Sequence, residues 1–149
     1  MFGNNLKYCR EELEMTQKEL GQILGVSEKT ISGWETAQDT MPFKTLIEFC
    51  NLYNYSIDFV IGFIRQNINH NQKIDITNKT IGDKLKTLRK DLNLSQQKLA
   101  DECGFSRSTY SRFETGHDLI NTITAYTLCK KYNISMDWLC NVSQNKYLK

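Results

Sequence analysis

The chain has 149 residues and a formal net charge of +2, a length that suits one ordinary domain or two small ones. Its longest apolar run, residues 59–64, is interrupted by Gly62 and is far too short to span a membrane. No basic stretch followed by an apolar one opens the sequence, so we see no secretory signal and expect a cytoplasmic protein.

Charge is divided unequally along the chain. Residues 1–66 contain six Lys or Arg against nine Asp or Glu, which gives −3, whereas residues 67–149 contain thirteen against eight, which gives +5. An anionic partner should therefore prefer the second half.

The sequence contains one segment twice. Residues 2–63 align with residues 81–142 without a gap, at an offset of 79 positions. Identical pairs include Arg10/Arg89, Gln17/Gln96, Ser27/Ser106, Glu35/Glu114 and Asp39/Asp118. The offset exceeds the roughly 20–50 residues of stacked solenoid repeats, so each copy is better interpreted as a domain of its own. We predict an acidic domain 1 over residues 1–64, a polar, Asn-rich linker over 65–79 and a basic domain 2 over 80–149.

Within domain 1, apolar residues recur at helical spacing in five short stretches, which predicts five helices. Residues 16–19 form a capping box before the second helix, and Gly25 ends that helix in a tight turn. Ser27 should cap the third helix, and Pro42 suits the first turn of the fourth. Domain 2 repeats this order. Nothing alternates with period two for long enough to build a sheet, so the predicted fold is all-α.

Residues 16–35 and 95–114 are the most informative stretches. Each predicts a short helix, a glycine turn and a second helix, held together by regularly placed apolar residues. The helix after the turn is the third of its domain. Ile31 and Trp34 in domain 1, like Tyr110 and Phe113 in domain 2, should anchor this third helix to the core. Its other face would then be free to enter a DNA major groove.

At these residues the chain resembles the phage repressor and Cro-like (Xre-type) helix-turn-helix family. The shared pattern is Thr/Ser-Gln-x-x-Leu-Ala/Gly, then Gly-Val/Phe-Ser, then Ile/Tyr-Ser-x-Trp/Phe-Glu, and it occurs in both copies. A trailing Ser-x-Asp-Phe/Trp-Val/Leu strengthens the match. The resemblance implies two tandem five-helix, lambda-repressor-like domains with double-stranded DNA as the partner.

The resemblance also implies roles for particular positions. The glutamines that open the second helices, Gln17 and Gln96, should meet a phosphate and brace the third helix. The first turn of the third helix should reach base edges; these positions are Ser27, Glu28, Lys29 and Thr30 in domain 1, and Ser106, Arg107, Ser108 and Thr109 in domain 2. One turn later the outward positions are Gly33 and Arg112. Arg10 with Glu35, and Arg89 with Glu114, resemble the family's internal ion pair.

The two copies are not equivalent as DNA readers. Arg107 or Arg112 could form a forked contact to guanine, the commonest specific base contact. Phosphate attraction would come from lysines of domain 2: Lys84, Lys86, Lys90, Lys98, Lys130 and Lys131. Domain 1 has Glu28 and Gly33 where domain 2 has these arginines. We therefore predict that DNA is read mainly by the third helix of domain 2, and that domain 1 either reads a different half-site or packs against protein.

Two functions follow from these features. The first is a sequence-specific transcriptional regulator of the phage or mobile-element repressor type, acting either through both domains of one chain or as a homodimer paired through domain 1. The alternative is a protein-interaction adaptor, similar to an antitoxin or an antirepressor, in which DNA contact is secondary. The acidic first half motivates this alternative.

No pattern indicates catalysis. The five cysteines form no C-x-x-C pair and no metal-ligand spacing, which favours buried thiols in a reducing compartment. His70 and His117 are isolated in the sequence, and no phosphate loop or nucleophile motif is present. We predict no enzyme activity, no catalytic or metal-binding residue, no cofactor and no small-molecule ligand.

Overall fold

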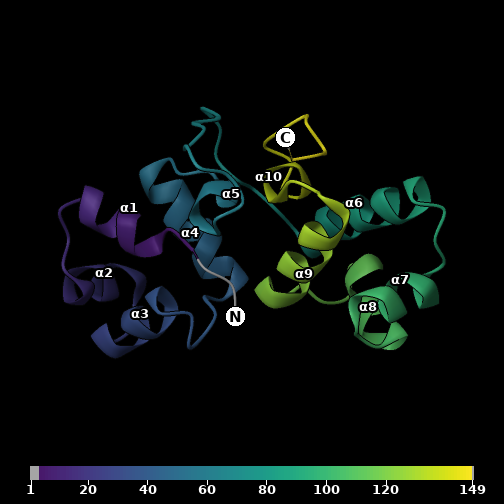
Figure 1. The fold of residues 1–149 in the computed structure, drawn as a ribbon, viewed down its shortest axis with the longest axis horizontal. Coiled ribbons are helices and arrows are strands. Elements are labelled where there is room, and N and C mark those ends of the chain that lie inside the picture. The colour runs from purple at the N-terminus through teal and green to yellow at the C-terminus, as the bar shows by residue number, and fades with distance from the viewer. Residues whose placement is uncertain (1–3, 149) are drawn as a thin grey trace. The chain divides into compact units, whose positions relative to one another are not determined.

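The computed structural model describes residues 4–148, so the predicted outer limits of the domains, residues 1 and 149, lie outside the described part. Contacts divide the chain into two compact units, unit 1 up to Lys73 and unit 2 from Ile74 (Figure 1). Within residues 4–148 there are ten α-helices and no strand, which confirms the predicted all-α fold.

Each unit contains five helices. Those of unit 1 are α1 (Leu6–Glu12), α2 (Gln17–Leu24), α3 (Glu28–Glu35), α4 (Phe43–Tyr53) and α5 (Ile57–Val60). Those of unit 2 are α6 (Asn78–Asp91), α7 (Gln96–Cys103), α8 (Arg107–Glu114), α9 (Thr122–Tyr132) and α10 (Met136–Leu139). The helix-turn-helix elements are therefore α2–α3 and α7–α8.

Local hydrogen bonds set the ends of these helices, as the sequence predicted. Thr16 and Glu19 form the reciprocal capping box of α2, and Ser95 caps α7. Gly25 and Gly104 end α2 and α7 with left-handed backbone at φ 74° and 81°. Both turns have a left-handed glycine at the same position, so α3 and α8 follow their turns with the same local backbone conformation.

The start of α4 differs slightly from the prediction. Pro42 is its N-cap residue and does not lie inside its first turn. The φ of −56° at Pro42 is within the range that the pyrrolidine ring imposes, and its carbonyl accepts the first helical hydrogen bond, from the Leu46 N–H at 2.9 Å.

Aliphatic and aromatic side chains from all five helices fill the core of each unit. In unit 1, Leu6, Leu20, Ile31, Phe49 and Ile57 are at most 1% exposed. In unit 2 the largest fully buried side chains are Tyr110, Ile81, Leu85, Leu88, Leu99 and Ile120. Trp34 and Phe113 are also buried, as predicted. Helices α3 and α8 are thus attached to their cores by Ile31 with Trp34, and by Tyr110 with Phe113.

Helix α6 crosses the end of α8 at close range. A Cβ added at Gly82 would lie 2.5 Å from the Glu114 carbonyl oxygen and 2.8 Å from that of Phe113. Such distances exclude any side chain there, so glycine is required by the approach of the two backbones. This contact fixes the C-terminal end of α8 against the rest of unit 2.

Part of the segment predicted as a linker is ordered against unit 1. The Asn67 amide donates to the Asn54 carbonyl at 3.0 Å and accepts from the Ser56 N–H at 2.7 Å. Lys73 donates to the Asn51 carbonyl. Helix α6 begins at Asn78, inside the predicted linker, because Thr77 and Thr80 form a capping box.

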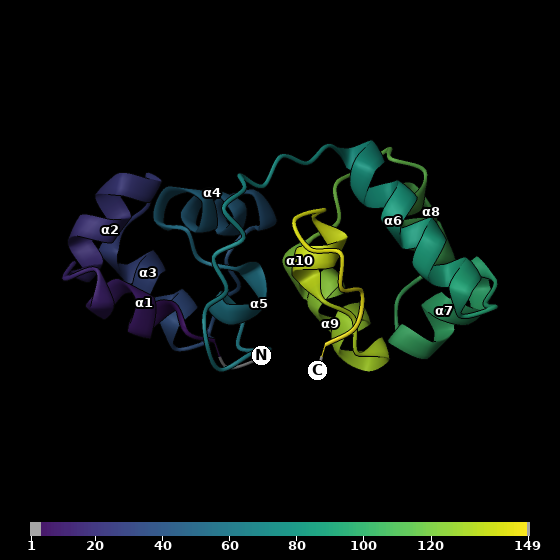
Figure 2. The same ribbon diagram turned by 90° about the horizontal axis from the view of Figure 1, so that it is seen from above.

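The last described residues of unit 2 return to the turn between α9 and α10. The Ser135 N–H donates to the Lys146 carbonyl at 2.8 Å, and the Leu148 N–H donates to the Asn133 carbonyl at 2.9 Å. Figure 2 shows this C-terminal segment running beside α9 and α10. No helix among residues 4–148 combines the length and apolar character that crossing a membrane requires.

The turn after the third helix gives a matched pair of stability predictions. Ala37 holds a left-handed φ of 61°, where the repeat has Gly116 at 80°. Left-handed backbone costs an L-residue about 1–2 kcal/mol, and glycine's extra freedom in the unfolded chain returns about 0.4–1 kcal/mol of that. We expect Ala37→Gly to stabilise unit 1 by about 0.5–1 kcal/mol.

Gly116→Ala should act in the opposite direction. Its Cβ would stand 3.0 Å from the Lys79 Cα in addition to the φ strain, so we expect unit 2 to lose at least about 1–2 kcal/mol. The two units can be followed separately in denaturation monitored by NMR, because Trp34 and Trp138 supply one indole N–H signal each. A loss of stability in Ala37→Gly would contradict the strain argument.

Candidate nucleic-acid interface

The residues predicted to read bases lie together on α8. Ser106 is its N-cap, and Ser106, Arg107, Ser108, Thr109 and Arg112 are all exposed. The opposite face of α8 is buried through Tyr110, Phe113 and Glu114. Helical periodicity therefore gathers two guanidinium groups and three hydroxyls on one accessible surface.

The hydroxyls at the start of α8 bond to one another. The Ser106 Oγ accepts from the Thr109 N–H at 3.2 Å and donates to the Thr109 Oγ1 at 2.8 Å. In unit 1, Ser27 and Thr30 repeat this arrangement at 3.1 and 3.0 Å. Ser27 and Ser106 are thus helix caps, as predicted, and their contact with bases stays a prediction.

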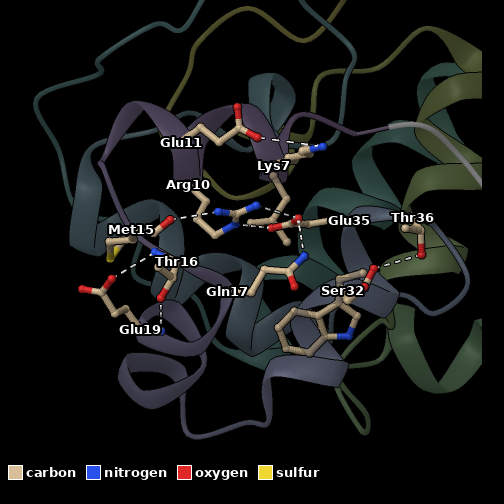
Figure 3. A network of polar contacts seen from close by, with 12 residues as sticks. Lys7, Arg10, Glu11, Met15, Thr16, Gln17, Glu19, Ser32, Glu35 and Thr36 are labelled. Carbon is tan, nitrogen blue, oxygen red and sulfur yellow. Dashed lines mark hydrogen bonds and ion pairs between the residues drawn. The ribbon is translucent and has the colours of Figure 1, made fainter.

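A buried ion pair holds the third helix of each unit to the first. In unit 1 the Arg10 guanidinium donates to both oxygens of Glu35, at 2.6 and 3.1 Å, and to the Met15 carbonyl at 2.9 Å (Figure 3). In unit 2 the guanidinium of Arg89 donates to Glu114 twice at 2.8 Å. The glutamate side chains are only 3% exposed, which confirms the predicted internal pairs.

The glutamine that opens the second helix joins the same network. Gln17 Nε2 donates to Glu35 at 3.0 Å, and Gln96 Nε2 donates to Glu114 at 3.3 Å. Three helices of each unit therefore meet at one carboxylate, which sets how the third helix projects. The bracing role expected for these glutamines is present, and their phosphate contact stays a prediction.

Electrostatics at Glu114 favour its charged form. Burial alone would raise the pKa of this carboxyl, but hydrogen bonds from Arg89, Tyr110 and Gln96 outweigh burial and lower the pKa. The same pairing raises the pKa of Arg89. Glu114 and Arg89 therefore both carry their charge at neutral pH.

Arg112 has a partner that the sequence did not reveal. Its Nε and Nη2 donate to the two carboxylate oxygens of Asp118, at 2.6 and 3.3 Å. Both side chains stay about half exposed, and the hydrogen bond from Arg112 lowers the pKa of Asp118. The identity of Asp118 with Asp39 across the repeat was the only sequence signal that could have pointed to it. Arg107, by contrast, forms no ion pair within residues 4–148.

The corresponding surface of unit 1 is different. Glu28 and Lys29 are exposed and Thr30 is half-buried. Gly33, predicted as an outward position, is buried: the Asp39 carboxylate covers it and lies 3.0 Å from the point where a Cβ would stand. Asp39 therefore lies over the helix position that carries Arg112 in unit 2.

The predicted phosphate-binding lysines fall into two groups. Those on the exposed surface of unit 2 are Lys86, Lys90, Lys98, Lys130 and Lys131. Lys84 departs from this group, because its ammonium lies 4.5 Å from the centroid of the Trp138 ring and burial lowers its pKa. The half-buried Lys84 side chain thus holds its ammonium in a cation–π contact with Trp138.

Side chains that can ligate metals are spread over the described part of the chain. No group of three His, Cys, Asp or Glu side chains there could hold a metal ion. The cysteines there form no disulfide. Burial raises the pKa of Cys9 to about 12, so this thiol stays protonated and unreactive.

Comparisons with known proteins agree with this geometry. The helix-turn-helix family matches the chain twice, over residues 6–60 and 85–139. The chain therefore belongs to the helix-turn-helix family, as the Xre-type resemblance predicted, and its class is that of DNA-binding regulators. No solved structure matches the chain significantly.

Three curated relatives are informative. The HTH-type transcriptional regulator ImmR of Bacillus subtilis is 30% identical over 88 residues, which are 59% of this chain and 68% of ImmR. The SPbeta prophage-derived regulator YonR of the same organism is 30% identical over 41% of this chain and 56% of its own length. The antitoxin PezA of Streptococcus pneumoniae is 38% identical over 37% of this chain and 35% of its own.

The ionised network gives a pH-dependent stability prediction. Because the pKa of Glu114 is lower in the folded chain than its ordinary value of 4.5, the pair stabilises unit 2 above pH 4.5 and this contribution is lost as pH falls below it. Glu114→Gln leaves Arg89 buried without its counter-ion and should cost about 3–5 kcal/mol at pH 7.

The cost of Glu114→Gln should shrink as the pH is lowered below 4.5, which denaturation of both proteins at several pH values would measure. Asp83→Asn is the control, because the Lys79–Asp83 pair is exposed and contributes little. An equal cost for Glu114→Gln at pH 3 and pH 7 would contradict the assignment of this pair.

Proposed function

We propose that this protein is a sequence-specific, double-stranded DNA-binding transcriptional regulator of the phage or mobile-element repressor type, and that α8 is its main reading helix. The observation that carries the proposal is the exposed face of α8, where Arg107, Arg112 and three hydroxyls stand on a helix rigidly attached to a basic unit. The relatives named as transcriptional regulators, one of them prophage-derived, support the class.

The dimensions and charges suit a major groove. A helix is about 10–12 Å across with its side chains, and the major groove is about 12 Å wide. Arg107 lies in the first turn of α8 with its guanidinium unpaired, so it would reach a base edge without breaking an existing contact. Exposed lysines such as Lys86, Lys90 and Lys98 would add sequence-independent attraction to phosphates.

Unit 1 is suited to a different task. Its third helix carries Glu28 in place of Arg107 and a covered Gly33 in place of Arg112, and a carboxylate near phosphates is repelled. We propose that unit 1 contributes little base reading and pairs two chains as a homodimer. Two α8 helices could then meet half-sites about 34 Å apart on one side of the duplex.

A second candidate is an antitoxin-like adaptor in which unit 1 binds a partner protein. The local similarity to the antitoxin PezA and the net charge of −3 over residues 1–66 favour it. In that case DNA binding by unit 2 would be secondary.

Selection of bound sequences from random duplexes by the full chain tests the proposal. We expect one motif to be enriched, and the double variant Arg107→Ala with Arg112→Ala to lose it, since each good base contact contributes about 1–3 kcal/mol. The matched double variant of unit 1, Glu28→Ala with Lys29→Ala, should keep the motif. Absence of any enriched motif from the unaltered chain would overturn the regulator proposal and favour the adaptor.

Glu28→Lys tests the place of unit 1 directly. If α3 lies away from DNA, this charge reversal should leave non-specific affinity and its salt dependence unchanged. Titration of a random duplex at several salt concentrations measures both. A steeper salt dependence in Glu28→Lys would show instead that α3 approaches the phosphates.

A further inference from the structure

We propose that Asp118 is a positioning residue for base recognition: it holds the Arg112 guanidinium so that the free edge of the guanidinium faces a guanine. This inference rests on the proposed function of α8 and assigns a specificity-determining role to a residue outside the recognition helix. Asp118 lies in the loop between α8 and α9, four residues beyond the last residue of α8.

The geometry of the pair leaves the correct edge of Arg112 available. The carboxylate of Asp118 accepts from Nε and Nη2, so the Nη1 group and the second hydrogen of Nη2 stay unoccupied. One N–H of Nη1 and the remaining N–H of Nη2 form a parallel fork, which is the arrangement that guanine O6 and N7 accept. Asp118 and a guanine could therefore bind two adjacent edges of the same guanidinium at once, sharing Nη2 through its two hydrogens.

The backbone fixes Asp118 relative to the arginine it holds. The N–H groups of His117 and Asp118 both donate to the Arg112 carbonyl, at 2.9 and 3.0 Å. Gly116, at φ 80°, turns the chain back to allow this. The carboxylate is thus attached by its own main chain to the residue whose side chain it orients, so its position follows the end of α8.

Unit 1 provides an internal comparison. There the N–H groups of Gln38 and Asp39 donate to the Gly33 carbonyl at 3.0 and 3.1 Å, so the same loop forms around the same aspartate. The residue that corresponds to Arg112 is Gly33, which has no side chain to pair with Asp39. The loop of unit 1 therefore folds without an ion pair. The Arg112–Asp118 pair of unit 2 is thus not needed to fold the same loop there.

The surroundings of the pair also point away from a stabilising role. Both side chains are about half exposed, and exposed ion pairs contribute little to stability. An aspartate close to a DNA-binding surface would repel phosphates unless its charge is neutralised, which Arg112 does. What the pair does achieve is to order a long, flexible side chain before DNA arrives, so less ordering is required on binding.

The test compares binding to the duplex selected by the unaltered chain with binding to duplexes changed at single base pairs. Arg112→Ala first identifies the base pair that depends on Arg112. Asp118→Ala and Asp118→Asn should then lower discrimination at that base pair by about two- to tenfold, the effect of freeing one side chain. Their affinity for random duplex should stay the same or rise, since a negative charge is removed.

Three controls separate positioning from a merely structural role. Asp39→Asn, the matched change in unit 1, should leave discrimination unchanged. Arg112→Lys, which keeps the charge but cannot form a fork, should lower discrimination at the same base pair as the Asp118 variants. Thermal unfolding of Asp118→Asn should match that of the unaltered chain.

The proposal is overturned if the Asp118 variants discriminate as well as the unaltered chain or better, or if specific and random duplexes lose affinity equally. It is also overturned if Arg112→Ala affects no single base pair. In these cases the unaltered chain still enriches a motif, so the proposed function stands. Failure of the unaltered chain to enrich any motif would instead remove the proposed function, and this inference with it.

Discussion

One buried carboxylate in each unit ties the third helix to the first and the second. Glu35 and Glu114 lie at the ends of α3 and α8, and each receives an arginine from the first helix of its unit and a glutamine from the second. Three helices are tied at one point, so the direction of the third helix does not depend on apolar packing alone. A small core benefits most from such a directional constraint, because units of this size bury little apolar surface.

Comparison of the two units separates the residues that hold the helices together from those that line the outer side of the third helix. Both units keep the same network, helix caps and left-handed turns after the second helix. The third helices differ at two corresponding positions: Glu28 corresponds to Arg107, and the buried Gly33 to the exposed Arg112. None of these four residues belongs to the Arg–Glu–Gln network, so the network is kept although they differ. The same scaffold thus carries two arginines on the exposed face in unit 2, and Glu28, Lys29 and Asp39 on the corresponding face in unit 1.

The sequence was sufficient for features that depend on neighbours close along the chain. Capping residues such as Ser106, the turn at Gly104 and the buried face of α8 follow from local hydrogen bonds and helical periodicity. The Arg89–Glu114 pair could be predicted only through resemblance to a family, since 25 residues separate its partners. Contacts without either signal were missed. Lys84 rests on the Trp138 ring through a tertiary contact, and no local pattern announces it.

Asp118 illustrates this limit and explains why it matters for function. A loop that turns back by hydrogen bonds to the Arg112 carbonyl cannot be inferred from periodicity, because the periodic helix has already ended there. This loop places Asp118 against one edge of the Arg112 guanidinium. Only an edge that is not already hydrogen-bonded within the protein can donate to a guanine. In unit 1 the same loop places Asp39 over a glycine, so the charge presented there is negative. The helix supplies the arginine, and the loop after it determines which edge of the guanidinium is left open to a partner.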